Sequence, residues 1–372
     1  MITLAQKVKE TYTYLHNIPE LGFQERQTSA YLADKLERSG YVVQKNVGIT
    51  GIIAILDSGF PGPTVGFRAD MDALGHEQDG QVVPIHSCGH DAHSAIVLTM
   101  AQEIARRGIV KGKVKIIFQP AEELMIGAKK MIATGLLNDL DILFGIHLRP
   151  IHDAVAGQAV PALYTGASTK IEVDIQGLTA HAARPHLGIN AADAVAAIIN
   201  GVHGIVMDTT VSSSIKVTKI RAGGAALNAI PDHAELVFDV RAQQNDVMKT
   251  LLNKAEKTIE FGALTVGATV KIRIQSGVPA AELDEKWINL AQKAILATVG
   301  AKGLLPPQYT PGGEDFHFFK QEIPGLEVGF IGLGADVTPG LHHPGMTINQ
   351  DSLADGVQIL LFIVDQIIEL KG

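Results

Sequence analysis

Short apolar runs alternate with helical patterns in the first and last parts of this chain, and this alternation most constrains its fold. Several runs are continuously apolar, which is typical of strands covered on both faces in a largely parallel sheet. Strands that alternate with helices favour a doubly wound α/β architecture. The predicted strands are 41–43, 51–56, 64–67, 114–118, 142–146 and 328–331. The predicted helices are 4–16, 26–39, 93–107, 121–133 and 357–370.

The middle of the chain alternates apolar and polar side chains, which is typical of half-exposed strands in an antiparallel sheet. The candidate strands are 170–176, 233–241, 268–275 and, with a weaker pattern, 214–220. Helical patterns at 190–206, with Asn190 as the expected N-cap, and at 245–261 give the order β-α-β-β-α-β of a ferredoxin-like unit. We therefore predict an inserted α+β domain. The predicted parts are a first catalytic half at 1–167, the inserted domain at 168–277 and a second catalytic half at 278–372.

Residues suited to metal binding or acid–base chemistry follow the predicted strands of the catalytic domain. Asp70 and Asp72 follow one strand, and Glu122 and Glu123 follow the next. His147 follows a third. Ligands of open α/β sheets bind beyond the carboxyl ends of the strands. We therefore expect these side chains to share one site.

Residues 86–93 read His-Ser-Cys-Gly-His-Asp-Ala-His and contain the only cysteine of the chain. Thiolate and neutral imidazole are preferred zinc ligands, and a glycine between Cys88 and His90 lets the backbone bend towards an ion. A lone cysteine is more often a small buried side chain. Together with the glutamate pair, His147 and His342, however, the motif supplies mixed S, N and O donors, and we predict a metal site.

The composition and charge of the chain exclude several function classes. Lys and Arg number 31 and Asp and Glu 39, so the net charge of −8 favours neither nucleic acid nor an anionic membrane as a partner. One cysteine excludes an internal disulfide framework and fits a reducing compartment. Residues 1–10 carry no signal-peptide pattern. The apolar stretch at 357–370 is too short and polar for a membrane span of about 20 residues. We expect a cytoplasmic protein.

The sequence resembles the zinc-dependent aminoacylase, carboxypeptidase and hippurate hydrolase family of metallopeptidases and amidohydrolases. The motifs run along nearly the whole chain and match the hippurate hydrolase and indole-acetyl-amino-acid hydrolase branch, in which a cysteine bridges two metals. They are Arg-Ala-Asp-Met-Asp-Ala-Leu at 68–74, Cys-Gly-His-Asp at 88–91, Gln-Pro-Ala-Glu-Glu at 119–123, Gly-Ile-His at 145–147, Ala-His at 180–181, Asn-Ala-Ile-Pro at 228–231, Gly-Gly-Glu-Asp-Phe at 312–316 and Leu-His-His-Pro at 341–344.

The resemblance implies a binuclear site holding two divalent ions, with zinc expected first and manganese, cobalt or nickel as alternatives. Cys88 resembles the bridging ligand and Glu122 the general base. The remaining ligands are His90, Glu123, His147 and His342. His342 is preferred to His343 because the branch carries a His-any-Pro pattern. The carboxylates expected to orient the ligating imidazoles are Asp70, Asp72 and Asp91.

The resemblance also implies that the inserted domain is a lid, with hinges near 165–168 and 276–279, and forms a homodimer. His181 resembles the residue that donates to the oxyanion of the reaction, across the dimer interface. Asn228, Arg241 and Gly313 are candidate contacts of the substrate carboxylate, Arg241 through a bidentate fork. Arg241 is equally consistent with a solvated strand end.

The segment 75–87 departs from the family's pattern. This loop is shorter than the family's, and Gly-His-Glu at 75–77 replaces the usual Pro-Ile-polar turn. Because the segment would lie near the substrate entrance, it leaves specificity less constrained than chemistry. His76 and His86 are additional imidazoles there, with either a substrate-contacting or a structural role.

The predicted function is therefore metal-dependent hydrolysis of small N-acyl amino acids. A peptidase that acts on dipeptides or other short peptides would use the same chemistry. A thiol nucleophile at Cys88 is a different mechanism, and it would leave the other predicted ligands without a role. A non-catalytic metal-binding protein is a third alternative, which Glu122 and His181 oppose.

Overall fold

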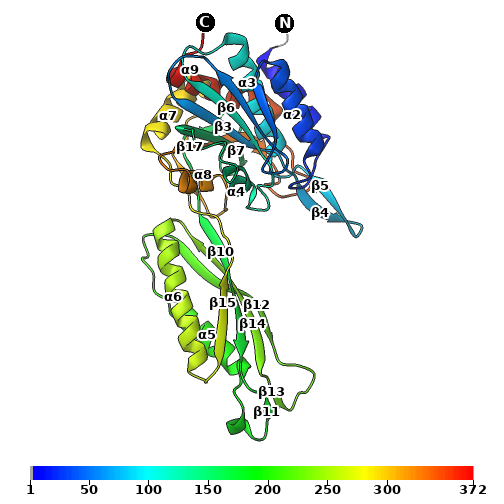
Figure 1. The fold of residues 1–372 in the computed structure, drawn as a ribbon, viewed down its shortest axis with the longest axis vertical. Helices are drawn as coiled ribbons and strands as arrows, with labels where there is room; N and C mark the ends of the chain where they lie inside the picture. Colours follow the sequence, from blue (N-terminus) through cyan, green and yellow to red (C-terminus); the bar gives the residue numbers. More distant parts are fainter. Residues whose placement is uncertain (1–2, 372) are drawn as a thin grey trace. The chain divides into compact units, whose positions relative to one another are not determined.

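The computed structural model describes residues 3–371, which form two compact units (Figure 1). Unit 1 extends to Tyr164 and also includes Glu282–Tyr309 and the chain from Asp315 onwards, whereas unit 2 consists of Thr165–Ala281 and Thr310–Glu314. The segment 310–314 lies outside the predicted inserted domain, yet its carbonyl groups accept hydrogen bonds from Gly166 N in unit 2. Within the described residues, no helix combines the length and apolarity needed to cross a membrane.

A seven-stranded mixed sheet forms the centre of unit 1. In spatial order its strands are β1 (Val42–Val47), β2 (Gly51–Asp57), β6 (Lys113–Gln119), β3 (Thr64–Asp70), β7 (Ile142–Pro150), β17 (Glu327–Val337) and β8 (Ala159–Val160). The central strands β6, β3, β7 and β17 pair in parallel, which confirms the predicted α/β fold class. The edges formed by β1, β2 and β8 are antiparallel.

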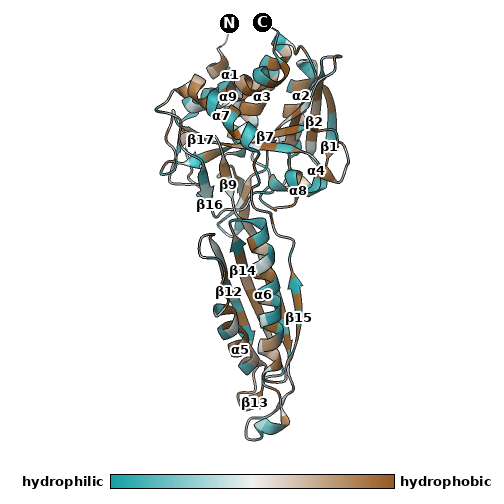
Figure 2. Ribbon diagram, turned by 90° about the vertical axis from the view of Figure 1, so that its left-hand side faces the viewer, coloured by the Kyte–Doolittle hydropathy of each residue, from teal (hydrophilic) through white to brown (hydrophobic). Residues whose placement is uncertain are grey.

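Helices cover both faces of this sheet. They are α1 (Leu4–His16), α2 (Arg26–Arg38), α3 (His90–Arg107), α4 (Gly127–Ile132), α7 (Glu285–Val299), α8 (His317–Glu322), α9 (Leu353–Ile368) and the 3-10 helix η2 (Gln350–Ser352). Figure 2 shows α1, α3, α7 and α9 on one side of the sheet and α4 and α8 on the other. The core between sheet and helices includes Phe144 and Trp287, whose ring centroids lie 5.8 Å apart.

The segment 75–87, which was expected to be a loop, is mostly a β-hairpin of β4 (Leu74–Gln78) and β5 (Gln81–Ile85). Asp79 and Gly80 form its two-residue turn, and their φ values are 51° and 76°. Asp-Gly is a favoured pair for a turn with two positive φ values. The sequence therefore contained a hairpin signal that our loop prediction overlooked.

Unit 2 has a four-stranded antiparallel sheet with the order β12-β14-β10-β15. Its main elements in chain order are β10 (Ala167–Gln176), α5 (Ala191–His203), β12 (Ser213–Ala222), β14 (His233–Ala242), α6 (Asn245–Leu264) and β15 (Thr269–Ile274). This is the predicted β-α-β-β-α-β order. Asn190 Oδ1 accepts a hydrogen bond from Ala192 N at 2.9 Å, as expected of an N-cap.

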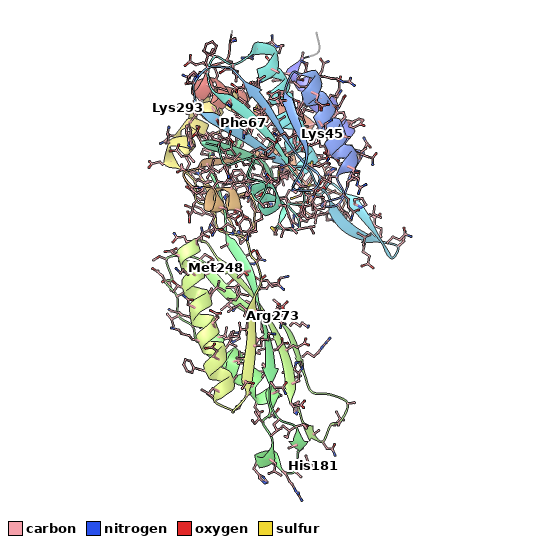
Figure 3. The ribbon with its side chains drawn as sticks, in the orientation of Figure 1. Lys45, Phe67, His181, Met248, Arg273 and Lys293 are labelled. Atoms are coloured by element: carbon pink, nitrogen blue, oxygen red, sulfur yellow. The ribbon has the colours of Figure 1, made fainter. Side chains whose placement is uncertain are left out.

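Unit 2 has a hydrophobic core of its own, in which Ile171 and Phe238 of the sheet pack with Ile259 of α6. Figure 3 labels Met248 on α6 and His181 on β11. The remaining short elements are β9 (Leu163–Thr165), β11 (Ala180–His181), the 3-10 helix η1 (Pro185–Leu187), β13 (Ala229–Ile230) and β16 (Gln308–Thr310).

Candidate metal centre

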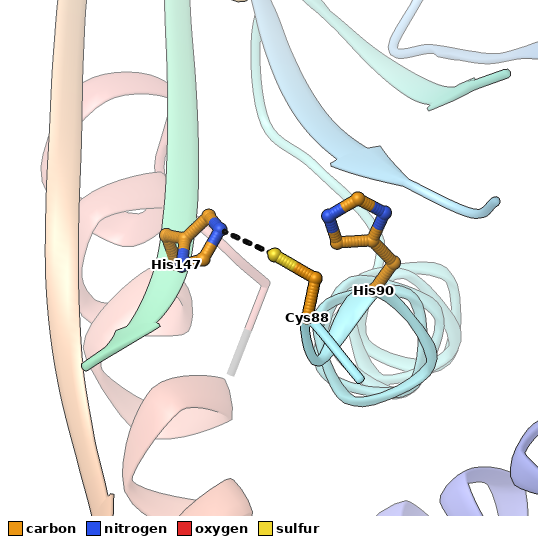
Figure 4. A group of neighbouring side chains, drawn as sticks. All are labelled: Cys88, His90 and His147. Carbon is orange, nitrogen blue, oxygen red and sulfur yellow. Dashed lines mark hydrogen bonds between the residues drawn. The ribbon is translucent and has the colours of Figure 1, made fainter. Parts of the chain in front are cut away.

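A glycine at the start of α3 places Cys88 and His90. Gly89 precedes the helix with a φ of 89°, and a Cβ there would lie 2.9 Å from Leu148 Cδ1. Any other side chain would therefore be both strained and too close to β7. Cys88 Sγ lies 3.7 Å from His147 Nε2 on β7, with the ring of His90 close by (Figure 4).

Glu123 and His342 join this cluster. Glu123 Oε1 lies 3.8 Å from His90 Nε2 and 3.6 Å from His342 Nε2. His342 Nε2 lies 3.3 Å from Cys88 Sγ, although the two residues are 254 positions apart in the chain. Two groups of three ligands, Cys88–His90–His147 and Cys88–Glu123–His342, each have their donor atoms within 4.8 Å of one another. The two groups share the thiol.

Glu122 lies on a turn, where the sequence predicted a helix over 121–133. That prediction is wrong for residues 121–126, because Ala121 and Met125 have positive φ values of 52° and 57° and α4 begins only at Gly127. Hydrogen bonds from the backbone of this turn to distant carboxylates outweigh its local helical propensity. Glu122 is 4% exposed, and its Oε2 lies 3.9 Å from His90 Nε2.

Buried polar atoms without partners show where cations fit. Among residues 3–371, neither His90 Nε2 nor Glu123 Oε1 has a hydrogen-bond partner, although both atoms are buried. Leaving such atoms unpaired costs free energy, and a divalent cation would satisfy both. Thiolate, imidazole and carboxylate are donors that zinc and related ions accept. The residues present therefore fit the metal ions that the sequence predicts.

Two candidate ligand rings are oriented by hydrogen bonds on their Nδ1 atoms. His90 Nδ1 donates to Asp72 Oδ1 at 3.0 Å, and His147 Nδ1 donates to the carbonyl oxygen of Leu148 at 2.7 Å. Both rings therefore direct Nε2 into the cluster, as ligating histidines commonly do. Asp72 also accepts from Glu123 N at 3.0 Å, so one carboxylate holds an imidazole and the backbone of the glutamate pair.

Burial and neighbouring charges set the protonation of the cluster. It raises the pKa of the Cys88 thiol well above its usual range and raises the pKa of Glu123 to about 7. Burial would lower the pKa of His90, but Asp70 and Cys88 outweigh it, and the pKa of His90 lies well above its usual value. The pKa of His147 is lowered by burial. Cys88 and His90 therefore hold protons that a cation must displace.

Residues 66–366 match the sequence profile of Peptidase family M20/M25/M40. The chain belongs to this peptidase family. It is therefore a metal-dependent hydrolase of amide bonds, and the resemblance identified in the sequence is confirmed.

Individual relatives agree with this membership. The N-acetylcysteine deacetylase of Bacillus subtilis (strain 168) is 30% identical over 351 residues, which cover 91% of this chain and 91% of that protein. The indole-3-acetyl-aspartic acid hydrolase of Enterobacter agglomerans is 30% identical over 340 residues, which cover 84% of this chain and 76% of that protein. The crystal structure of the Bacillus subtilis YXEP protein, a dinuclear metal binding peptidase from the M20 family, superposes with a TM-score of 0.83 at 26% identity and covers 99% of both chains.

A buried ionic network that the sequence did not reveal supports the centre of this M20-family chain. The Arg68 guanidinium, 1% exposed, donates to Asp70 at 2.8 Å, to Asp315 at 3.1 Å and to Gln119 at 2.9 Å. Asp70 in turn accepts from His93 Nδ1 at 2.7 Å. The motifs at 68–74 and 312–316 contained Arg68 and Asp315, but nothing in them showed that the two side chains meet.

Asp91 makes a different contact from the one expected. Its carboxylate accepts from His16 Nδ1 at 2.6 Å and from Ala92 N at 2.9 Å, so it holds α1 against α3. The hydrogen bond to Asp91 raises the pKa of His16. Of the three expected carboxylates, Asp72 therefore binds His90 of the cluster directly, and Asp70 Oδ2 lies 3.7 Å from His90 Nε2.

The three predicted residues of the inserted domain, His181, Asn228 and Arg241, lie in unit 2, and so does Gly313, which belongs to the predicted second catalytic half. His181 is exposed on β11, and Asn228 is exposed just before β13. Arg241 on β14 donates to Asp239 Oδ1 at 2.8 Å and to the carbonyl oxygen of Pro311 at 3.0 Å. A Cβ added at Gly313 would lie 2.6 Å from Val278 Cγ2, so a larger side chain does not fit there.

His76 and His86 have different surroundings. His76 Nε2 lies 2.8 Å from Ser87 Oγ, which ties the β4–β5 hairpin to the segment that carries Cys88. His86 is buried, and neither of its ring nitrogens has a hydrogen-bond partner in the part of the chain that the structure describes. The contact with Ser87 gives His76 a structural role.

Proposed function

We propose that this chain is a binuclear metal-dependent amidohydrolase that removes the acyl group from N-acyl amino acids. The observation that carries the proposal is the pair of ligand groups that share Cys88 Sγ. One thiolate common to two sets of donors suits two neighbouring cations. The relatives named for N-acetylcysteine and indole-3-acetyl-aspartic acid support the substrate class. Zinc is the proposed ion, with manganese, cobalt or nickel as alternatives that share these ligands.

Glu122 is the proposed general base. Bound divalent ions would supply Lewis-acid polarisation of the amide carbonyl and a water of lowered pKa. The Glu122 carboxylate takes a proton from the attacking water and passes it to the leaving amine nitrogen. The distance of 3.9 Å from its Oε2 to His90 Nε2 supports this assignment.

We further propose that His181 donates to the developing oxyanion and that Asn228, Arg241 and Gly313 contact the substrate carboxylate. His181 Nδ1 accepts a hydrogen bond from Ala183 N at 3.0 Å. In the neutral ring Nε2 therefore carries the hydrogen, and its exposed side chain presents a donor. Unit 2 is proposed to serve as the lid and as the surface of a homodimer.

A thiol nucleophile at Cys88 is the mechanism that the burial of this side chain opposes. Nucleophilic cysteines are thiolates with lowered pKa values, whereas burial raises the pKa of Cys88. A thiol enzyme would keep its activity after chelation. The proposed hydrolase would lose it.

The test is hydrolysis of hippurate, N-acetyl amino acids, indole-acetyl-amino acids and dipeptides by chelated enzyme, with and without added zinc, manganese or cobalt. The expected result is metal-restored release of a free amino acid. The N-acyl amino acids should be cleaved faster than the dipeptides, and the opposite preference would identify a peptidase. Activity that survives complete metal removal would contradict the proposed function.

A further inference from the structure

We propose that Glu25 is a positioning residue that holds the turn carrying Glu122 in the geometry of the general base. The inference rests on the proposed function, because it concerns the residue assigned there as the base. Glu25 precedes α2 and is distant in sequence from every predicted ligand. Neither the sequence motifs nor the proposed mechanism gives it a role.

The Glu25 side chain is 0% exposed, and both of its oxygens are engaged. Oε1 accepts a hydrogen bond from Ala121 N at 2.9 Å, and Oε2 accepts one from Thr50 Oγ1 at 2.6 Å. Burial is the main cause that raises the pKa of Glu25. A buried carboxyl group costs free energy unless its hydrogen bonds are made. The hydrogen bond from Ala121 N therefore stabilises both the Glu25 carboxyl group and the backbone at residue 121.

Glu25 does not cap its own helix. In the described chain its side chain makes no capping hydrogen bond to α2. The neighbouring Glu20 does this instead, because its Oε2 accepts from Gln27 N at 2.9 Å and from Thr28 N at 3.0 Å. Two nearby glutamates thus have separate tasks, which provides a matched control.

The turn needs external support. Ala121 has a φ of 52°, a conformation that residues with a Cβ seldom adopt. Such strain persists only where surrounding contacts determine it, and it concentrates at active sites. Two buried carboxylates bracket Glu122 here: Glu25 binds the amide of the residue before it, and Asp72 binds the amide of Glu123 after it.

The segment that carries Glu25 also packs directly on the turn. A Cβ added at Gly22 would lie 3.1 Å from both Cα and Cβ of Ala121. That distance is tighter than ordinary van der Waals contact, so the turn would have to shift by a few tenths of an ångström. Gly22→Ala is therefore a second, milder way to displace the base while Glu25 stays in place.

The experiment compares Glu25→Ala, Glu25→Gln and Gly22→Ala with the parent enzyme at equal bound metal. We expect Glu25→Ala to lower kcat by about 100-fold, as misplaced catalytic groups do, with KM and metal content unchanged. Glu25→Gln should keep most of kcat, because its amide oxygen can accept from Ala121 N while its amide nitrogen donates to Thr50 Oγ1. Gly22→Ala should show a smaller loss. Glu20→Ala, the control, should lower the melting temperature and leave kcat unchanged.

A double-mutant cycle separates positioning from a merely structural role. If Glu25 acts through Glu122, Glu25→Ala should cause no further loss in a Glu122→Gln background. An equal loss in both backgrounds, or a normal kcat per bound metal in Glu25→Ala, would overturn the inference. A fully active Glu122→Gln variant would instead overturn the proposed function, so the two failures are distinguishable.

Discussion

As the proposed shared ligand, Cys88 is expected to couple the protonation of the centre to its metal content. Its sulfur is common to both ligand groups, and burial raises its pKa, so the metal-free thiol is protonated at neutral pH. Thiolate is the form that binds a cation. Cation binding through Cys88 should therefore release the one thiol proton, and a second ion that shares the thiolate releases none from it.

We predict that metal affinity rises with pH, by about tenfold per pH unit for each proton released. Calorimetric zinc titrations in buffers with different ionisation enthalpies would count the protons. Cys88→Ser should bind more weakly and release at least one proton fewer. Equal proton counts for the two proteins would show that Cys88 is not the protonated ligand.

The candidate ligands could be proposed from sequence because each belongs to a short motif, whereas the support that Glu25 gives could not. Cys88 and His90 are two positions apart, and Glu122 and Glu123 are adjacent. Glu25 and Ala121, by contrast, are 96 positions apart. A hydrogen bond of that separation leaves no local pattern, since Glu25 looks like any polar residue at the start of a helix.

Two elements near the site show where local patterns fail. The turn at 121–126 has helix-compatible residues, but Glu25 and Asp72 bind its backbone amides and stop the helix. The hairpin at 74–85 carries an Asp-Gly turn signal in strands with many polar residues, so its hydrophobic pattern is weak. Tertiary contacts determine the structure of the turn, and the Asp-Gly pair determines that of the hairpin, whereas hydrophobic periodicity determines neither.

The β4–β5 hairpin is predicted to support His342, a proposed metal ligand. His76 Nε2 lies 2.8 Å from Ser87 Oγ, and the carbonyl oxygen of Ser87 accepts a hydrogen bond from His342 N at 2.6 Å. Removing the imidazole should loosen this link. His76→Ala is expected to weaken binding of one ion by about 10- to 100-fold, as loss of a supporting contact does.

Stepwise chelation followed by metal analysis would measure this effect. Gln78→Ala is the control, because Gln78 is exposed on the same strand. Chelation curves of His76→Ala that coincide with those of the parent would contradict the role given to the hairpin.

Helix α8 begins with a histidine whose burial should make the fold sensitive to acid. Among the described residues, neither ring nitrogen of His317 has a hydrogen-bond partner. Burial is the larger cause and the positive charge of Arg68 the smaller cause that lower the pKa of His317 to about 3. The unfolded chain takes up this proton near pH 6.5, earlier than the folded chain does. Stability is therefore lost as the pH falls from about 6.5 towards 3, by about 1.4 kcal/mol per pH unit.

His317→Leu should remove this loss. When the pH is lowered from about 7 to about 5, the free energy of urea unfolding of the variant should rise by about 2 kcal/mol relative to that of the parent. His203→Leu, at an exposed position of α5, should show no such gain. A pH dependence of His317→Leu identical to that of the parent would contradict the assignment.

The molecule as a whole consists of two units with separate hydrophobic cores. The sequence analysis proposed an inserted domain because the change from continuous to alternating apolar patterns is a local signal. It did not predict that 310–314 packs with unit 2, since that short segment has no pattern of its own. All five proposed metal ligands lie in unit 1.

Metal should therefore stabilise unit 1 selectively. Binding to the folded state raises its stability in proportion to the logarithm of metal concentration over Kd. Trp287, the chain's one tryptophan, is buried in unit 1 and reports its unfolding by fluorescence. We predict a zinc-dependent rise in the fluorescence-detected Tm, while circular dichroism retains a zinc-insensitive transition. If both methods detect one transition that shifts with zinc, the prediction that the two units unfold independently would be contradicted.

The role of Glu122 is tested by comparing Glu122→Gln with the parent enzyme, both reloaded to the same metal content. We predict that kcat falls by about 100- to 10,000-fold while metal binding is unchanged, because a general base is lost and the proposed ligands remain. Glu123→Gln should differ by losing metal. A Glu122→Gln enzyme that turns over at the parent rate would contradict the mechanism.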